Sequence, residues 1–125
     1  MTADRTKHTT DFHKALACLE RALERPMTSR LERVGLVKFY DLAYWQAWQV
    51  LRDELVECGT PAFGPDDSVR KALQIGLIHD RDAWQEMVLA EERFMQYFID
   101  DELEKATAVI RTRYYPALQE TALHQ

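Results

Sequence analysis

The side chains that could bind a substrate in this sequence are mainly aromatic, since the acidic pair Glu91–Glu92 and the acidic run at residues 100–102 are expected to be solvated faces and a helix cap. The histidines are scattered, and the chain has no CxxC, HExxH or Glu-x-x-His pair that would indicate a metal site. Ser68 and His79 lie on separate predicted elements without a nucleophile-elbow motif. A P-loop and a glycine-rich dinucleotide turn are also absent from the sequence. The sequence therefore predicts no cofactor, no metal site and no hydrolase chemistry.

The aromatic residues allow two interpretations. Most of them recur at helical spacing, which favours packing in a core or a dimer interface. Trp45 is the exception, because it lies about 60° around the helix from Trp48, on the far side from Tyr44. We therefore expect Trp45 to face a partner. The alternative is a pocket for a nucleotide or another small ligand, lined by Trp45, Trp84 and Tyr97.

These residues must be positioned by helices, and the central one is predicted over residues 36–58. The stretch contains no proline or glycine, and its apolar residues recur at spacings of three and four. A second apolar line runs beside the first, so the apolar surface is wider than that of an ordinary surface helix. Such a helix is typical of the centre of a bundle or of a subunit interface.

Capping residues and helix breakers divide the rest of the chain into four further helices. Gly59 and Gly76 are natural C-terminal ends, and Pro116 should kink or restart the last helix. We predict an all-α, up-and-down bundle of about five helices, forming one domain over residues 1–125 with a flexible N-terminus at residues 1–10. The expected N-terminal caps are Thr10 or Asp11, Thr28 or Ser29, Asp66 or Asp67, Asp80 or Asp82, and Asp100 or Asp101.

Composition limits the class of protein. The formal net charge of −5 argues against binding nucleic acid by bulk electrostatics, which needs a clustered basic surface. Cys18 and Cys58 fall on or beside apolar faces and are expected to be buried free thiols. There is no signal peptide and no apolar run of the roughly 18 residues needed to span a membrane. We expect a cytoplasmic protein that does not act at a membrane.

Four features in order carry a family resemblance. They are the aromatic helix ending AWQVLRDELVECG, the segment SVRKALQIGLI, the DxW opening of the next helix and the terminal RYYPAL. Together they resemble the HEPN superfamily, and most closely the small bacterial proteins labelled nucleotidyltransferase substrate-binding protein. The resemblance covers about residues 12–123. It implies a HEPN-like helical bundle that forms a homodimer and works with a minimal nucleotidyltransferase.

The HEPN ribonuclease motif is degenerate in this chain. Many HEPN ribonucleases use Arg-Asn, then a His a few residues later, and a Tyr two positions beyond it. Anchored on the DxW segment, these positions hold Glu91 and Glu92, Gln96, and Phe98. Gln cannot act as an acid or base, and Glu91 would repel phosphate. Phe98 also lacks the hydroxyl that a partner transferase could modify in this family, so we expect no ribonuclease activity.

Three hypotheses follow. The first is a non-catalytic, homodimeric partner of a minimal nucleotidyltransferase, which presents substrate or regulates the enzyme as in toxin–antitoxin-like pairs. The second is a bundle that binds a nucleotide or another small ligand. The third is a residual ribonuclease or RNA binder in which Arg93 and Tyr97 replace the lost pair. The candidate ligand or partner surface comprises Trp45, Gln49, Trp84, Arg93 and Tyr97.

Overall fold

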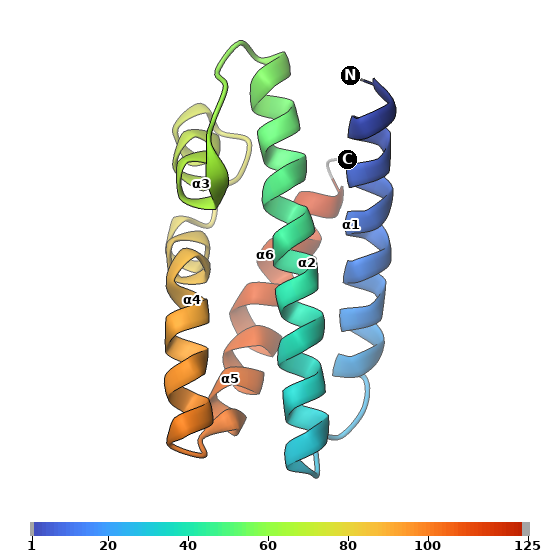
Figure 1. Ribbon diagram of the computed structural model, residues 1–125, viewed down its shortest axis with the longest axis vertical. Helices are drawn as coiled ribbons and strands as arrows, with labels where there is room; N and C mark the ends of the chain where they lie inside the picture. The colour runs from blue at the N-terminus through green and yellow to red at the C-terminus, as the bar shows by residue number, and fades with distance from the viewer. Residues whose placement is uncertain (1, 124–125) are drawn as a thin grey trace.

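The computed structural model describes residues 2–123, with side chains from residue 5 onward, and every regular element in this range is helical (Figure 1). The predicted all-α fold is therefore confirmed. The elements are α1 (Thr2–Leu23), α2 (Arg30–Glu57), α3 (Gly64–Ile75), α4 (Arg81–Ile99), α5 (Leu103–Val109), the π-helical η1 (Ile110–Tyr114) and α6 (Tyr115–Leu123).

Helix α2 is the centre of the bundle. It packs along α1 over most of its length and also contacts α3, α5 and α6 (Figure 1). Helix α4 lies on the far side from α1 and is connected to the bundle mainly through α3, α5 and η1. Since α4 makes few backbone-level contacts with α2, side chains must fill the space between these two helices.

Aromatic rings form the middle of the core. Tyr40 of α2 packs against Phe94 of α4 and Tyr114 of η1, with ring centroids 5.5 Å apart in both pairs. Tyr40, Trp84 and Tyr114 are among the largest fully buried side chains. Large aromatic rings bury much apolar area each, so this cluster is a major source of stability.

The last three elements form one rod with a wide turn in its middle. The N–H of Tyr115 donates to the carbonyl of Ile110, five residues earlier, and the α-helix resumes at Tyr115. Pro116 follows directly. Because proline has no N–H and its ring crowds the preceding turn, a π-turn accommodates it without ending the rod. The predicted restart at Pro116 thus occurs as a π-turn.

Two of the predicted caps are confirmed. Ser29 begins α2 with a capping box: the N–H of Glu32 donates to Ser29 Oγ at 3.1 Å, and the N–H of Ser29 donates to Glu32 Oε1 at 3.0 Å. Asp80 begins α4 by accepting a hydrogen bond from the N–H of Ala83 at 3.1 Å.

The other three caps are wrong. Helix α1 already begins at Thr2, so Thr10 and Asp11 lie inside it. Helix α3 begins at Gly64, before Asp66 and Asp67, because a proline in its first turn fits the helix start. Helix α5 follows Glu102, which makes no side-chain capping bond. Mobility of residues 1–10 remains a prediction, although helix covers residues 2–10.

The cysteine prediction is half right. Cys18 and Cys58 are free thiols, but Cys58 is exposed and Cys18 is only half-buried. Cys58 lies at the C-terminal end of α2, past the last buried residue of that helix, Leu55. None of the described helices is long and apolar enough to cross a membrane.

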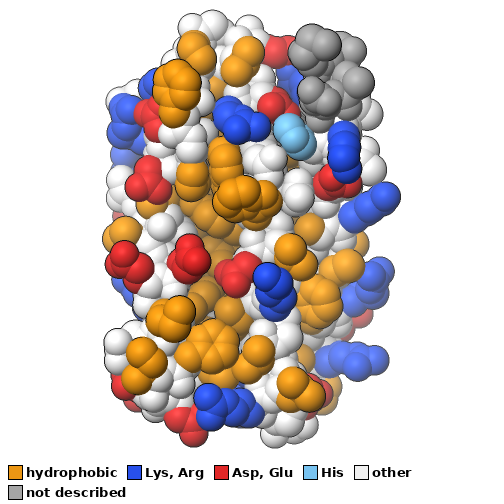
Figure 2. All heavy atoms as spheres, viewed as in Figure 1, with side chains coloured by type: hydrophobic (Ala, Val, Ile, Leu, Met, Phe, Trp, Pro, Cys, Tyr) orange, Lys and Arg blue, Asp and Glu red, His pale blue; other side chains and the backbone are white. Residues whose placement is uncertain are grey.

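An exposed apolar stripe runs along α2. It comprises Leu31, Leu42, Trp45 and Val56, which lie on one side of the helix and are each at least 45% exposed. Figure 2 shows hydrophobic side chains gathered along the middle of the face that α2 presents. We call these four residues the α2 apolar stripe. Exposed apolar residues that share one side of a helix are candidates for an interaction site.

The Ser29 cap offers a test of the α2 start. Ser29→Ala removes the acceptor for the N–H of Glu32, so we expect the free energy of unfolding to fall by about 1 kcal/mol in urea denaturation. Thr10→Ala is the control. Since Thr10 lies inside α1, this change should leave stability equal or slightly higher. A comparable loss in both variants would contradict the assignment of the two helix starts.

Candidate functional site

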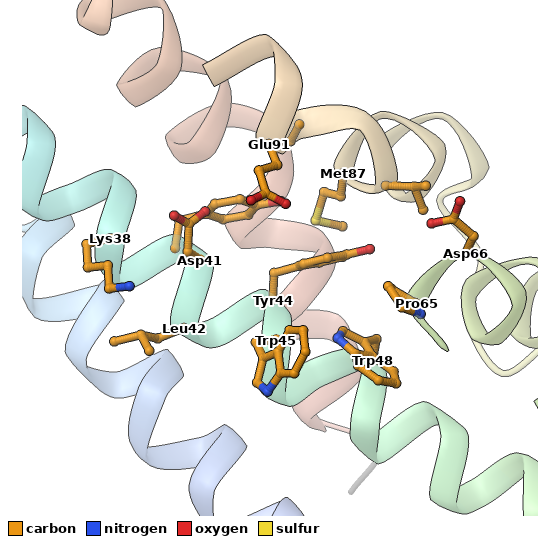
Figure 3. A pocket seen from close by; sticks show the side chains of 13 residues that line it. Lys38, Asp41, Leu42, Tyr44, Trp45, Trp48, Pro65, Asp66, Met87 and Glu91 are labelled. Carbon is orange, nitrogen blue, oxygen red and sulfur yellow. The ribbon is translucent and has the colours of Figure 1, made fainter. Parts of the chain in front are cut away.

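A pocket of about 430 Å³ lies between α2 and α4, with the first turn of α3 at one end (Figure 3). Its volume is in the range of pockets that hold small molecules. The pocket occupies the space where α2 and α4 stay apart at backbone level. The lining residues are Lys38, Tyr40, Asp41, Leu42, Tyr44, Trp45 and Trp48 of α2, Pro65 and Asp66 of α3, and Met87, Val88, Ala90 and Glu91 of α4.

Two neighbouring stripes of α2 give the pocket its character. Tyr40, Tyr44 and Trp48 recur every four residues and form the inner wall. Asp41 and Trp45 lie one position further round the helix and form the outer rim. One helix therefore supplies both an aromatic floor and a mixed acidic and aromatic mouth.

The inner wall holds polar atoms without partners. Tyr40 Oη, Tyr44 Oη and Trp48 Nε1 are buried and make no hydrogen bond to any described residue. Tyr40 is 2% exposed and Trp48 is 5% exposed. A buried polar group left unpaired costs about 1–3 kcal/mol, and most such groups in folded proteins do have a partner. All three atoms belong to residues that line this one pocket.

Burial keeps both phenols neutral. Desolvation raises the pKa of Tyr40 well above its ordinary value, and the neighbouring Tyr44 and Tyr114 raise it further. Desolvation also raises the pKa of Tyr44, with a contribution from the Asp66 carboxylate. Both hydroxyls thus carry a proton at neutral pH and can donate to a ligand or accept from it.

Carboxylates surround the mouth. The side chains of Asp41 on α2 and Glu91 on α4 point toward one another, while Asp66 lies at the α3 end (Figure 3). Desolvation raises the pKa of Asp41 to about 6, and Glu91 raises it while Lys38 lowers it. None of the three carboxylates takes part in an ion pair with the residues that the structure describes.

Trp45 stands at the rim, where the sequence predicted an exposed aromatic. It is 55% exposed and meets Trp48 edge-on, with centroids 5.1 Å apart and an interplanar angle of 88°. The guanidinium of Arg52 lies 5.2 Å from the centre of the Trp48 ring and helps to fix that ring. Gln49 donates to the carbonyl of Trp45 at 3.2 Å, so its amide is engaged within α2.

Comparison with known protein families identifies the family to which this chain belongs. The family described as nucleotidyltransferase substrate binding protein like matches residues 7–124. The chain belongs to this family. The match confirms the resemblance to the substrate-binding branch of the HEPN proteins. No curated protein matches the chain at a significant level.

The structure does not bring together the three aromatic residues that the sequence predicted to line a ligand pocket, namely Trp45, Trp84 and Tyr97. Trp84 is 1% exposed and packs beside Tyr44, with centroids 6.5 Å apart, so it supports the pocket wall from within the core. Tyr97 is half-buried against Phe94, with centroids 6.2 Å apart, and does not line the pocket. Of the three predicted aromatics, only Trp45 contributes to the lining.

The positions of the degenerate motif lie on different sides of α4. Glu91, Glu92 and Gln96 are exposed, and Gln96 donates to Asp100 at 3.0 Å. Phe98 is half-buried against the core. Glu91 lines the pocket. The register that assigns these residues to the family motif remains a prediction.

Arg93 is less available than the ribonuclease hypothesis requires. Its guanidinium lies 3.5 Å from a carboxylate oxygen of Glu86. Arg113 pairs with the same carboxylate, and Tyr114 donates to it at 3.3 Å. Arg93 is thus part of a surface ion-pair network and not of the pocket.

Sequence reasoning missed the polar half of the site. Asp41 was not singled out, although a carboxylate four residues before Trp45 on an apolar helix was a visible signal. Asp66 was expected to be a helix cap and instead lies at the pocket end. The unpartnered atoms of Tyr40, Tyr44 and Trp48 had no sequence signal, since their isolation depends on α4.

The raised pKa of Asp41 gives a stability prediction. Its pKa is about 6 in the folded state against an ordinary value of 3.8, so the folded state holds more protons between these values. The wild-type free energy of unfolding therefore falls as the pH rises through this window. Asp41→Asn removes this loss. We expect the variant to gain stability over the wild type from about pH 4 to about pH 7 in urea titrations.

The same titration contains its control. Below the ordinary pKa both proteins carry a neutral side chain at position 41, so their stabilities should nearly coincide there. A stability difference that stays constant across the whole pH range would contradict desolvation of the Asp41 carboxylate.

Proposed function

We propose that the chain is a non-catalytic, substrate-binding subunit of a small nucleotidyltransferase, and that the pocket between α2 and α4 holds the substrate. The observation that carries this proposal is the set of unpartnered buried atoms of Tyr40, Tyr44 and Trp48 in a pocket of small-molecule size. A ligand that reaches these atoms would supply the hydrogen bonds that they do not make to the described residues. The family description, which names substrate binding, supports the same conclusion.

The lining residues support binding and presentation over catalysis. None of them is a histidine, serine or cysteine, so the described pocket lacks the Ser–His or Cys–His pairing that activates a nucleophile in many hydrolases. The raised pKa values of Tyr40 and Tyr44 keep both phenols protonated at neutral pH, so neither is available as a general base. In this proposal the partner supplies the nucleotide and the chemistry, and the two proteins form a toxin–antitoxin-like or enzyme–subunit pair in the cytoplasm.

The α2 apolar stripe supports a homodimer. Leu42 and Trp45 lie at its centre, directly beside the pocket mouth. A second copy that covers the stripe would remove exposed apolar surface from water at about 25 cal/mol per Å². In such a dimer the two pockets would open next to the shared interface.

Partner capture tests the proposal. We expect the tagged chain, purified from its native host, to bring down a small nucleotidyltransferase in a stable complex whose size-exclusion mass fits a dimer of the chain plus the enzyme. A tag-only purification is the control. Purified chain that carries bound nucleotide or RNA and no transferase would overturn the proposal in favour of the ligand-binding or RNA-binding hypotheses.

The pocket's role has a separate kinetic readout. In the complex, Trp48→Phe keeps an aromatic ring but removes the indole N–H, so we expect a higher KM for the acceptor substrate with the complex intact. An unchanged KM would show that the substrate binds elsewhere.

The dimer is tested by one pair of matched variants. Leu42→Lys places a charge in the centre of the α2 apolar stripe and should shift the protein from dimer to monomer in sedimentation velocity at micromolar concentration. Leu89→Lys makes the same change on α4, away from the stripe, and should leave the dimer intact. Leu42 is 45% exposed and Leu89 57%, so both changes should be tolerated by the fold. A wild-type monomer would refute the dimer.

A further inference from the structure

We infer that the pocket between α2 and α4 binds an organic amine that also carries hydroxyl or other acceptor oxygens, and that it rejects nucleotides and other phosphate esters. That this amine is the acceptor substrate rests on the proposed function. The binding preference itself rests only on the residues of the pocket.

The charges of the lining residues favour a positively charged ligand. The lining contains three carboxylates, Asp41, Asp66 and Glu91, against one ammonium group, Lys38. At a separation of 4 Å, two unit charges interact by about 1 kcal/mol in water and about 4 kcal/mol in the environment of a protein surface. A phosphate ester would meet this repulsion. A protonated amine between Asp41 and Glu91, whose side chains point toward one another, would instead be attracted by both carboxylates and relieve the repulsion between them.

The unpartnered polar atoms indicate which hydrogen-bonding groups the ligand needs. The indole N–H of Trp48 can only donate, so its partner must be an acceptor atom on the ligand. The Tyr44 side chain extends toward the α3 end of the pocket, where Asp66 stands (Figure 3). The ligand therefore needs an acceptor oxygen near Trp48 and donors or positive charge toward the two acidic ends.

The apolar walls of the pocket favour a ligand with an organic body. Trp45 and Trp48 meet edge to face, and Tyr44 and Met87 face the same space. Aromatic faces attract cations and pack against sugar or ring carbons. A bare metal ion would leave these walls unused, and no described group of three or more His, Cys, Asp or Glu is placed to hold one. The combination fits an amino sugar or another hydroxylated amine with a compact body.

The test uses the purified full-length chain and follows the three tryptophan indole N–H signals by NMR, assigned with Trp45→Phe and Trp48→Phe. The probes are glucosamine and tyramine, their neutral N-acetylated forms, glucose 6-phosphate, and ATP with Mg²⁺. We expect an amine to shift the Trp48 indole signal with a Kd in the millimolar range or tighter. The N-acetylated forms should bind at least about tenfold more weakly, and the two phosphates should not bind at the pocket.

Two variants tie the preference to the carboxylates. Asp41→Asn combined with Glu91→Gln should weaken amine binding at least about tenfold, because both changes keep shape and remove charge. Glu92→Gln removes a neighbouring carboxylate that does not line the pocket and should leave binding unchanged. Thermal unfolding of each variant confirms that it is folded.

Three results of the binding experiment would contradict the inference. Failure of both amines to bind at about 10 mM, equal binding of amines and their N-acetylated forms, or tighter binding of Mg²⁺–ATP would overturn the inference. The outcome is separable from the proposed function. If the chain forms a complex with a transferase but its pocket does not bind amines, only this inference is contradicted. If the chain binds amines but has no transferase partner, only the proposed function is contradicted.

Discussion

The packing of Tyr40 against Phe94 and Tyr114 is the contact on which the rest of the structure depends. It joins α2, α4 and η1 through one fully buried ring, so α4 is held to the bundle at this point although its backbone stays apart from α2. The same residue also limits the packing. Its hydroxyl is buried and makes no hydrogen bond to the described residues, so the core gains the ring's apolar burial and retains one uncompensated polar atom.

The pocket exists because aromatic side chains separate α2 from α4 and do not fill the whole space between them. The pocket opens at the surface, and the residues that line it carry buried polar atoms whose lack of partners costs stability. Asp41 shows the same conflict, since desolvation raises its pKa to about 6 and the folded state is less stable when it ionises. Unpaired phenols, an unpaired indole and a desolvated carboxylate in one place are a common sign of a binding site, where stability is given up for recognition.

How far the sequence predicts this structure depends on how local each signal is. The course of α2 and its Ser29–Glu32 capping box follow from periodicity and short-range hydrogen bonds, and both are confirmed. The start of α1 was wrong because its polar first turns are held by distant residues: His8 Nδ1 lies 2.6 Å from Asp53 Oδ2, and Arg5 pairs with Glu54 and Glu57. Trp45 could be singled out from its angle on the helix. The acidic mouth could not, because it needs Glu91 brought to Asp41 by the tertiary fold.

The position of Glu91 connects the lost motif with the proposed ligand. The resemblance to HEPN ribonucleases places an arginine at this point, a residue suited to phosphate by its charge and its forked donors. In the register that the resemblance predicts, Glu91 of α4 puts a negative charge where those ribonucleases carry a positive one. Opposite Asp41, the reversed charge favours a cation over an anion by electrostatics alone. In that predicted register, the same bundle with one charge reversed would favour a different class of ligand, because the fold sets where the ligand sits and the charges around the mouth set which ligand it is.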